Sequence, residues 1–376
     1  MTAAVVFWAA TVFVLYTYAG YPLLISLLAR RRALPDCPLL DHAALPPITV
    51  VMAAYNEAAR LPAKISNLRA LDYPQHLVEI LIVSDGSTDD TLEVLARTPG
   101  VRTLSYAQRR GKAYALNLAM TAVQTEFVVF CDVRQALEPG AVRRLISDFC
   151  DPAVGAVSAE LVHRPSGTQT GQNIGLYWRY EKAIRKAESR FHSTVGATGA
   201  LYAIRKADYQ PLAPDTILDD FEIPMQITRK GKRTLLDPRA LVYDLLQTES
   251  AAEKKRKIRT LTGNFQTFSR HFWLFNPAIN PVWFQFMSHK VCRLFVPYAL
   301  VLTLVTSAMM PTPFYRVMLM LQLAFYLLAA LGQWVPAARR SRVVSFAHVF
   351  FDMNAAAILA LLRFLSGRVD ARWEKT

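Results

Sequence analysis

Three short polar segments each follow an apolar run whose length and composition are typical of a buried β-strand. They are Tyr55-Asn56-Glu57 after residues 48–54, Asp85-Gly86-Ser87 after residues 80–83, and Asp132-Val133-Arg134 after residues 127–130. The runs are rich in β-branched or aromatic residues and helical patterns separate them, which predicts a βαβαβ unit with a parallel sheet. Ligands of such sheets bind beyond the carboxyl ends of the strands. We therefore expect the three acidic segments to line one binding edge.

A further acidic pair, Asp219-Asp220, stands just before the amphipathic stretch 221–227, where a helix is expected to begin. Carboxylates in a ligand site can hold a hard cation such as Mg²⁺ or Mn²⁺. A carboxylate whose environment raises its pKa can also take a proton from a hydroxyl group. The pair is therefore a candidate for proton transfer, although either acid could instead cap the helix.

Basic residues lie where they could meet an anionic ligand. Lys112 follows Gly111 at the start of a helical pattern, where a lysine can approach a diphosphate as a point charge. A solvated surface lysine is the alternative for this position. Arg256 and Arg259 belong to the basic stretch 254–259, and guanidinium groups suit a diphosphate through bidentate contacts. This stretch could instead contact only anionic lipid headgroups.

An apolar segment precedes the acidic loops. Residues 5–29 carry no charge and are long enough to cross the hydrocarbon core of a bilayer. No basic residue precedes this stretch, so we expect a transmembrane anchor rather than a signal peptide. Arg30-Arg31-Arg32 follows at once, and the positive-inside rule therefore places the N-terminus outside and the next domain in the cytoplasm.

Apolar sequence returns after the last basic stretch. Residues 291–310 and 314–334 are apolar enough to span a membrane, whereas 343–365 contains Asp352 and Asn354 and could form a span or a re-entrant hairpin. The aromatic segment before them is expected to lie at headgroup depth, or to be a buried loop of the preceding domain. The expected division is an N-terminal anchor over 1–32, an α/β domain over 45–270, an interfacial helix over 271–290 and a C-terminal transmembrane region over 291–376.

Composition agrees with a membrane-attached α/β domain. The chain has 376 residues, of which 53% are hydrophobic, and a mean hydropathy of +0.19. Its formal net charge is +14, but the cations cluster beside apolar stretches, so we expect membrane lipid and an anionic ligand as partners and no nucleic acid. A dinucleotide-binding oxidoreductase would need a Gly-rich strand-to-helix turn early in the chain, and the sequence has none there. The four cysteines have no paired spacing, so we expect neither a zinc site nor a disulfide, in line with a reducing cytosol.

Several motifs, taken in order, carry a resemblance to a known family. They are Tyr55-Asn56-Glu57, Asp85-Gly86-Ser87-Thr88-Asp89, Gly111-Lys112-Ala113 with Leu116-Asn117, Phe130-Cys131-Asp132, Gly196-Ala197-Thr198-Gly199-Ala200, Asp219-Asp220, and residues 256–266. Together they resemble the membrane-embedded family 2 glycosyltransferases, the branch that includes cellulose, hyaluronan and poly-N-acetylglucosamine synthases. The resemblance covers about residues 45–270. It implies an α/β fold of the GT-A (Rossmann-like) type, in a cytoplasmic domain with flanking transmembrane helices.

The resemblance assigns donor-side roles. Asp132 matches the first acid of a pair that holds Mg²⁺ or Mn²⁺, with a turn or helix cap as the alternative. Arg134 stands where the second acid is expected, so a cation could rest on Asp132, waters and donor phosphates, or Arg134 could pair with phosphate itself. Asp85 matches an acid that contacts the nucleoside, with an Asx turn as the alternative. Tyr55 and Glu57 resemble the first nucleotide-contacting loop, although Glu57 could serve only the helix dipole.

The resemblance also assigns acceptor-side roles. Asp220 matches the general base of the family's Thr-Glu-Asp motif, Asp219 is its neighbour, and residues 196–200 form the acceptor floor in relatives. Arg259 matches the arginine of the Gln-x-x-Arg-Trp motif found in processive members. Arg256 replaces the glutamine of that motif and Thr260 replaces the tryptophan. The absent tryptophan weakens the expectation of processive synthesis, because that ring lines the acceptor channel of the processive enzymes.

The expected function is inverting transfer of a sugar by a membrane-bound glycosyltransferase (hexosyltransferase). The donor would be a nucleotide sugar of the UDP type, and the acceptor a growing polysaccharide or lipid-linked glycan. The expected location is the cell (inner) membrane, with several spans and a divalent cation as cofactor. Two alternatives are a single-addition polyprenyl-phosphate glycosyltransferase and a catalytically impaired membrane assembly partner, the latter because Arg134 replaces an acid.

Overall fold

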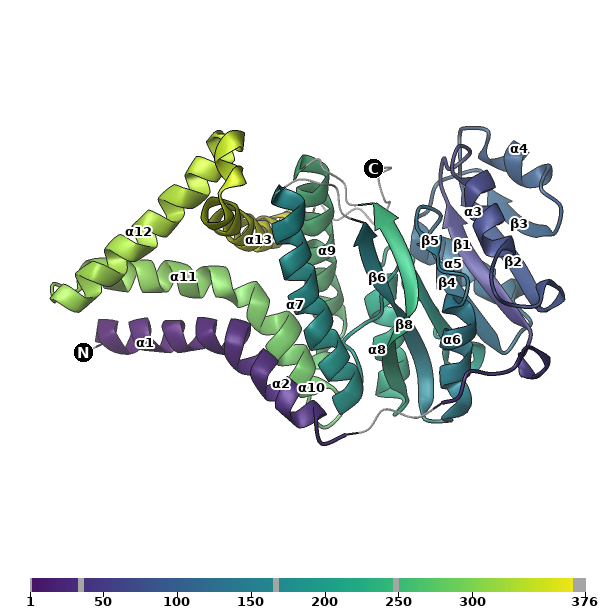
Figure 1. Cartoon of the computed structure of the whole chain (residues 1–376), viewed down its shortest axis with the longest axis horizontal. Coiled ribbons are helices and arrows are strands. Elements are labelled where there is room, and N and C mark those ends of the chain that lie inside the picture. The colour runs from purple at the N-terminus through teal and green to yellow at the C-terminus, as the bar shows by residue number, and fades with distance from the viewer. Residues whose placement is uncertain (1, 33–36, 165–168, 246–249, 368–376) are drawn as a thin grey trace.

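Eight strands form one mixed sheet in the computed structural model, which describes residues 2–32, 37–164, 169–245 and 250–367 (Figure 1). The strands are β1 (Ile48–Ala54), β2 (Val78–Asp85), β3 (Val101–Tyr106), β4 (Phe127–Cys131), β5 (Ala136–Leu137), β6 (Val154–Arg164), β7 (Leu201–Arg205) and β8 (Arg233–Leu245). Their order in the sheet is β3-β2-β1-β4-β7-β6-β8-β5. β1 pairs in parallel with β2 and β4, and β2 with β3, so the expected α/β fold and its parallel donor half are confirmed.

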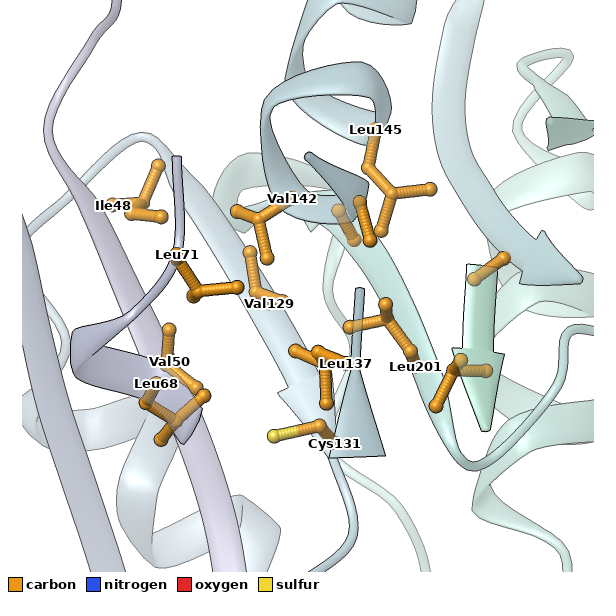
Figure 2. Packing of buried hydrophobic residues seen from close by; sticks show 14 of the residues in the cluster. Ile48, Val50, Leu68, Leu71, Val129, Cys131, Leu137, Val142, Leu145 and Leu201 are labelled. Carbon is orange, nitrogen blue, oxygen red and sulfur yellow. The ribbon is translucent and has the colours of Figure 1, made fainter. Parts of the chain in front are cut away.

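Both faces of this sheet are covered by helices. One face packs against α3 (Leu61–Arg69), α4 (Thr91–Ala96) and α6 (Ala141–Ser147), and Figure 2 shows this core around Val50, Leu68, Val129 and Leu145. The other face packs against α5 (Lys112–Ala122) and α8 (Asp219–Arg229). Alternate residues of β1 enter the two cores, as the period of two in a strand requires. Short 3₁₀ helices connect these elements at His42–Ala44, Gln75–Leu77, Asp148–Cys150 and Lys206–Asp208.

Two long helices lie between the sheet and the apolar end of the molecule (Figure 1). They are α7 (Gln169–Phe191), which packs against α2 (Tyr21–Ala29), and α9 (Ser250–Arg270), which packs against α13 (Arg342–Leu365). Buried residues of α9, η6 (Phe272–Phe275), η7 (Phe286–Val291) and α11 (Cys292–Met309) join Phe221 and Met225 of α8 in a separate apolar cluster. The helix that begins with the acidic pair is therefore held between the sheet and the apolar helices.

The remaining helices form the apolar end of the molecule. They are α1 (Thr2–Leu15), η1 (Tyr16–Gly20), α2 (Tyr21–Ala29), η6 (Phe272–Phe275), α10 (Trp283–Gln285), η7 (Phe286–Val291), α11 (Cys292–Met309), α12 (Pro313–Trp334), η8 (Pro336–Arg340) and α13 (Arg342–Leu365). Among the described residues, four stretches are long and apolar enough to cross a membrane: Thr2–Ala29, Trp283–Met309, Pro313–Trp334 and Arg342–Leu365. The last is one continuous helix, not a hairpin, and it packs against both α12 and α9.

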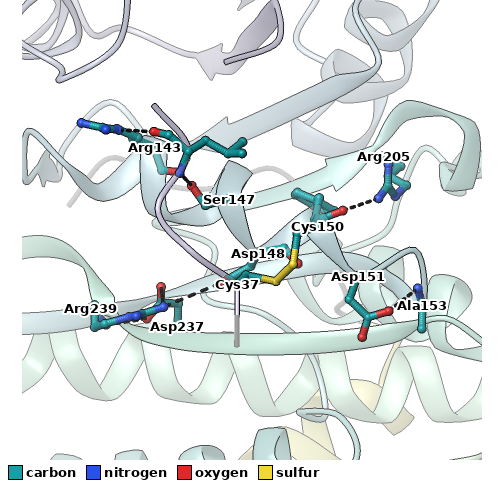
Figure 3. The surroundings of a disulfide bond; sticks show 12 residues. Cys37, Arg143, Ser147, Asp148, Cys150, Asp151, Ala153, Arg205, Asp237 and Arg239 are labelled. Carbon is teal, nitrogen blue, oxygen red and sulfur yellow. Dashed lines mark hydrogen bonds and ion pairs between the residues drawn. A yellow bond between two sulfur atoms is a disulfide. The ribbon is translucent and has the colours of Figure 1, made fainter. Parts of the chain in front are cut away.

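A disulfide joins Cys37, which precedes β1, to Cys150, which follows α6 (Figure 3). The expectation of no disulfide is therefore wrong. The two cysteines are 113 residues apart, but the fold brings their Cα atoms within 6.0 Å. Spacing along the chain could not reveal the pair, because the contact is made by tertiary packing. Because two cysteines are paired, the cysteines no longer indicate a reducing cytosol. The expected cytoplasmic location of the α/β domain therefore rests on Arg30-Arg31-Arg32 alone.

Candidate active site

The loops after β1 and β2 are tied to each other at the carboxyl edge of the sheet. Asn56 has a positive φ of 54°, and its side-chain oxygen accepts a hydrogen bond from the backbone N–H of Thr88 at 2.8 Å. The backbone N–H of Glu57 donates to the hydroxyl of Thr91 at 2.8 Å, and the Glu57 carboxylate pairs with Arg60 at 3.2 Å. The two expected nucleotide-contacting loops thus form one surface.

Asp85 holds a third loop to this surface. Its carboxylate is fully buried, and one oxygen accepts from the hydroxyl of Tyr106 at 2.8 Å and from the backbone N–H groups of Arg110 at 2.7 Å and Gly111 at 3.0 Å. These bonds fix the turn from β3 into α5, so the contacts of Asp85 are with its own protein. Contact of Asp85 with a nucleoside stays a prediction.

An arginine of that third loop stacks over the first loop. The Arg109 guanidinium lies 3.7 Å from the ring centroid of Tyr55, which places Tyr55 at the centre of the three loops. The loops meet at Gly86, whose φ is +61° and where an added Cβ would lie 2.5 Å from the backbone nitrogen of Arg109. Only glycine suits that position, because it tolerates both the conformation and the close approach.

Lys112 lies between Asp132, at the expected donor edge, and the acidic pair Asp219-Asp220. Its ammonium nitrogen lies 2.9 Å from an Asp132 carboxylate oxygen and 3.1 Å from an Asp219 carboxylate oxygen. Burial alone would lower the pKa of Lys112, but the carboxylates of Asp132, Asp219 and Asp220 outweigh it and raise the pKa above the ordinary value. The lysine is therefore a fixed positive charge among three acids, and the surface alternative is wrong.

The segment that carries Asp132 is supported from α3. Lys64 is buried, and its ammonium donates to the backbone oxygen of Gln135 at 2.8 Å. Asn67 makes a reciprocal pair with the backbone of Leu137 at 2.8 and 2.9 Å. Sequence reasoning missed both residues, because a lysine and an asparagine inside a helix give no signal of burial.

Arg134 does not lie in a carboxylate cluster for metal. Its guanidinium pairs with Asp244 near the end of β8, and Gln135 donates to the same Asp244 oxygen at 3.2 Å. Among the described residues, no group of three His, Cys, Asp or Glu side chains could hold a metal ion by itself. Asp132 remains a single carboxylate with a side chain 39% exposed, accessible to a cation that brings further ligands.

Asp219 and Asp220 begin α8, and their environments differ. Asp219 is 5% exposed and paired with Lys112. Asp220 accepts a hydrogen bond from the backbone N–H of Gly199 at 3.1 Å. Burial first, and then the charge of Asp219, raise the pKa of Asp220 to about 6. A carboxylate with that pKa is ionised near neutrality yet basic enough to accept a proton.

The loop over residues 196–200 packs directly on this acid. The backbone N–H of Ala197 donates to the backbone oxygen of Asp220 at 2.7 Å, and an added Cβ at Gly199 would lie 2.8 Å from its carboxylate oxygen. Thr198, between them, accepts a hydrogen bond from Arg185 of α7 at 2.8 Å. The structure thus places the glycine loop beside the proposed base, and it adds Arg185, which sequence reasoning missed.

The basic stretch lies on α9. Arg256 and Arg259 are partly buried on this helix, and Ile258 between them packs on Ala356 and Ala360 of α13. Further along α9, the side-chain oxygen of Gln266 accepts from the backbone N–H of Ile217 at 3.0 Å. The described contacts of α9 therefore support the segment leading into Asp219, and the phosphate role of the two arginines stays a prediction.

The site as a whole combines a partly exposed edge, where the resemblance places a donor, with the partly buried carboxylate of Asp220. Tyr55, Glu57 and Asp85 line interlocked loops at one end, and Lys112 bridges Asp132 to the acidic pair. Fixed cations beside a ligand edge can stabilise charge that develops on a leaving group. A carboxylate with a raised pKa a short distance away can accept a proton from an incoming hydroxyl. This arrangement suits displacement of an anionic leaving group by an oxygen nucleophile.

Comparison with known proteins shows similarity to a glycosyltransferase family model and to two polysaccharide synthases. Residues 49–211 match the family model "Glycosyl transferase family 2". The chain is 24% identical over 241 residues to the poly-beta-1,6-N-acetyl-D-glucosamine synthase of Staphylococcus epidermidis, covering 62% of this chain and 58% of that protein. The Staphylococcus aureus synthase is 24% identical over 251 residues, covering 65% and 60%. The chain thus spans about three fifths of the length of these relatives.

A solved structure matches almost the whole chain. It is that of the mannosyltransferase PcManGT from Pyrobaculum calidifontis in complex with GDP-Man and Mn²⁺, with a TM-score of 0.71 and 23% sequence identity. The match covers 96% of this chain and 99% of the other. It extends beyond the sheet to the apolar helices, so the arrangement of both parts is shared.

Proposed function

We propose that this chain is a family 2 glycosyltransferase of GT-A fold and acts as a membrane-bound inverting enzyme with a nucleotide-sugar donor. The acceptor would be a growing polysaccharide or a lipid-linked glycan. One observation carries the proposal: Lys112 joins Asp132, at the end of a donor strand, to Asp219, which adjoins the raised-pKa carboxylate of Asp220. An impaired assembly partner would have no need to keep this cluster intact.

In the proposed reaction Asp220 is the general base. The acceptor hydroxyl oxygen attacks the anomeric carbon of the donor, and its proton passes to the Asp220 carboxylate. The bond from that carbon to the diphosphate breaks, and the nucleoside diphosphate leaves with the electron pair. A single displacement of this kind inverts the configuration at the anomeric carbon. Asp219 cannot serve as readily, because its carboxylate is paired with Lys112 at 3.1 Å.

Lys112 and Asp132 would act on the leaving group. The ammonium of Lys112 is held between two carboxylates and can exchange part of that contact for a phosphate oxygen. The residues present fit a divalent cation that is shared with the donor, because one partly exposed carboxylate plus phosphates and waters is a usual ligand set for Mg²⁺. When bound, such a cation would neutralise charge on the diphosphate.

The membrane helices set the side from which the acceptor arrives. Among the described residues, four stretches could span a membrane, and α8 with its acidic pair is packed against α9, η6, η7 and α11. Arg30-Arg31-Arg32 supports a cytoplasmic catalytic domain in the inner membrane through the positive-inside rule. A donor taken from the cytoplasm and an acceptor held at the membrane would then meet at Asp220.

The test is turnover of a panel of UDP-, GDP- and dTDP-sugars by the full chain in native membranes, with mass analysis of the products. The panel is needed because a solved relative binds GDP-Man while the sequence resemblance favours UDP-sugars. We expect one donor class to be consumed with release of nucleoside diphosphate and formation of a glycosylated product of inverted configuration. Absence of donor binding and of turnover across the panel would reject the proposed function.

A further inference from the structure

The glycine loop beside Asp220 uses three consecutive backbone N–H groups as donors. Ala197 donates to the backbone oxygen of Asp220 at 2.7 Å, and Gly199 donates to the carboxylate of Asp220 at 3.1 Å. The N–H between them, that of Thr198, donates to the hydroxyl oxygen of Ser158 at 2.8 Å. The two outer donors therefore bind the proposed base, and the middle donor fastens the loop to Ser158.

Ser158 belongs to a rigid part of the sheet. It is fully buried in β6, a strand that is paired on one side with β7 and on the other with β8. Opposite Ser158 in the two ladders stand Tyr202 and Leu236, which are buried as well. Strands and helices of a scaffold position functional groups more precisely than loops do. The serine hydroxyl is therefore a fixed point to which the loop is attached.

The hydroxyl of Ser158 makes all of its hydrogen bonds within the protein. A serine hydroxyl has one donor and two acceptor positions. It donates to the backbone oxygen of Ala159 at 3.2 Å, and it accepts from Thr198 and, at 3.4 Å, from the guanidinium of Arg185. No position is left for a ligand, so any effect of Ser158 on the reaction must act through these contacts.

Arg185 of α7 fastens the same loop residue by its side chain. The guanidinium donates to the hydroxyl of Thr198 at 2.8 Å, in addition to its contact with Ser158. Thr198 is thus held at its backbone by β6 and at its side chain by α7. The residue between the two donors to Asp220 is therefore fixed from two elements of the fold.

The loop and the start of α8 are in tight contact, so a shift of the loop would be passed on to the carboxylate. An added Cβ would lie 2.8 Å from an Asp220 carboxylate oxygen at Gly199, and 3.3 Å from the Cα of Phe221 at Gly196. A general base must lie within hydrogen-bond reach of the hydroxyl whose proton it takes. A misplacement of about 1 Å can cost about 10²-fold in rate. The attachment of the loop should therefore matter for transfer.

We propose that Ser158 is a positioning residue for the reaction: by holding the N–H of Thr198, it keeps the N–H of Gly199 directed at the Asp220 carboxylate. The inference rests on the proposed function, because it takes Asp220 as the base. Ser158 acts through the loop and needs no contact with donor or acceptor. The alternative is that its hydroxyl only satisfies a buried N–H group and contributes to stability alone.

The test compares Ser158→Ala with Ser147→Ala in the purified full chain. Ser147 is also buried, and its hydroxyl accepts the loop N–H of Leu40 at 3.0 Å, so both variants remove the same kind of contact. Transfer from radiolabelled UDP-, GDP- and dTDP-sugars gives kcat and donor KM. We expect Ser158→Ala to lower kcat about 10- to 100-fold with donor KM within about threefold, and Ser147→Ala to leave both within about twofold. Both variants should lower the unfolding temperature to a similar extent.

Two further variants keep the test decisive. Ser158→Cys fills the space of the hydroxyl with a sulfur that accepts hydrogen bonds only weakly, so it should fold even if Ser158→Ala does not, and it should also lower kcat. In the Asp220→Asn background, Ser158→Ala should reduce the residual transfer by less than about twofold, because a residue that acts through the base has little effect once the base is gone.

The outcomes separate this inference from the proposed function. Equal kcat changes in Ser158→Ala and Ser147→Ala, or a loss from Ser158→Ala that is unchanged in the Asp220→Asn background, would overturn the positioning role while sugar transfer by the wild type stands. A raised donor KM with unchanged kcat would overturn it as well. A wild-type protein that neither binds nor turns over any donor of the panel would instead reject the proposed function, and the positioning role with it.

Discussion

Replacing Asp220 by Asn should remove sugar transfer and at the same time stabilise the fold. The base of the proposed reaction must accept a proton, which an amide cannot do, so transfer should fall by about 10²–10⁴-fold. Donor binding should stay near the wild-type level, because the donor edge is built from other loops. The amide oxygen of Asn can still accept the hydrogen bond from Gly199, so the local packing is kept.

The stability effect follows from the pKa of Asp220, which is raised from 3.8 to about 6. For an acid with a raised pKa, the folded state binds the proton more tightly, so ionisation opposes folding as the pH rises through that range. A pKa difference of about two corresponds to about 3 kcal/mol at pH 8, and to roughly half of that at pH 5. Asp220→Asn removes this penalty, so its gain in stability should be larger at pH 8 than at pH 5.

The assay combines transfer kinetics with thermal unfolding of the detergent-solubilised full chain at both pH values. Wild-type transfer should decline as the pH falls below about 6, because the base becomes protonated. Asp215→Asn is the matched control, since that acid is exposed and pairs only with Arg270 among the contacts described, and its activity should stay within about twofold. A variant of Asp220 with lower stability at pH 8, or with equal loss of donor affinity, would refute the assignment of a general base.

Three further predictions concern other parts of the chain. Asp132→Asn should lower donor turnover by about 10²-fold, as loss of a major electrostatic stabiliser does, and full wild-type activity in excess chelator would contradict the cation role. Arg259→Lys should lose most turnover in both neutral and anionic nanodiscs if the guanidinium binds the diphosphate, whereas near-native rates in both would leave only a lipid role. Cys37→Ser should destabilise the fold by about 2–4 kcal/mol, seen as a lower unfolding temperature that reductant also produces in the wild type. An unfolding temperature insensitive to reductant would contradict a disulfide in the isolated protein.

Strand ends were the part of this fold that the sequence predicted well. Short apolar runs followed by Asp85 and Asp132 identified β2 and β4, because buried parallel strands have a composition that few other elements share. The strand over Val101–Tyr106 was not recognised, since it is an edge strand of partly buried, mixed residues. Edge strands need less apolar surface, so a pattern based on burial passes over them.

The sequence predicted a contact between two side chains only where one motif contained both residues. Lys112 was expected near an anion, but its two carboxylate partners lie 20 and 107 positions away along the chain, and only the fold brings them together. The same holds for Lys64 beneath the Asp132 segment. A lysine in a helix looks the same in sequence whether it is solvated or buried, because burial depends on the elements packed above it.

The charges around the site explain what changes when arginine stands at position 134 in place of an acid. Asp132, Asp219 and Asp220 already gather around a single ammonium, and a further carboxylate there would add repulsion. Arg134 instead pairs with Asp244 of β8, so the metal-side ligand set stays at one carboxylate. One carboxylate holds a divalent cation weakly unless phosphates complete the shell. Cation and donor should therefore bind as a unit, which leaves Lys112 to neutralise the acids between turnovers.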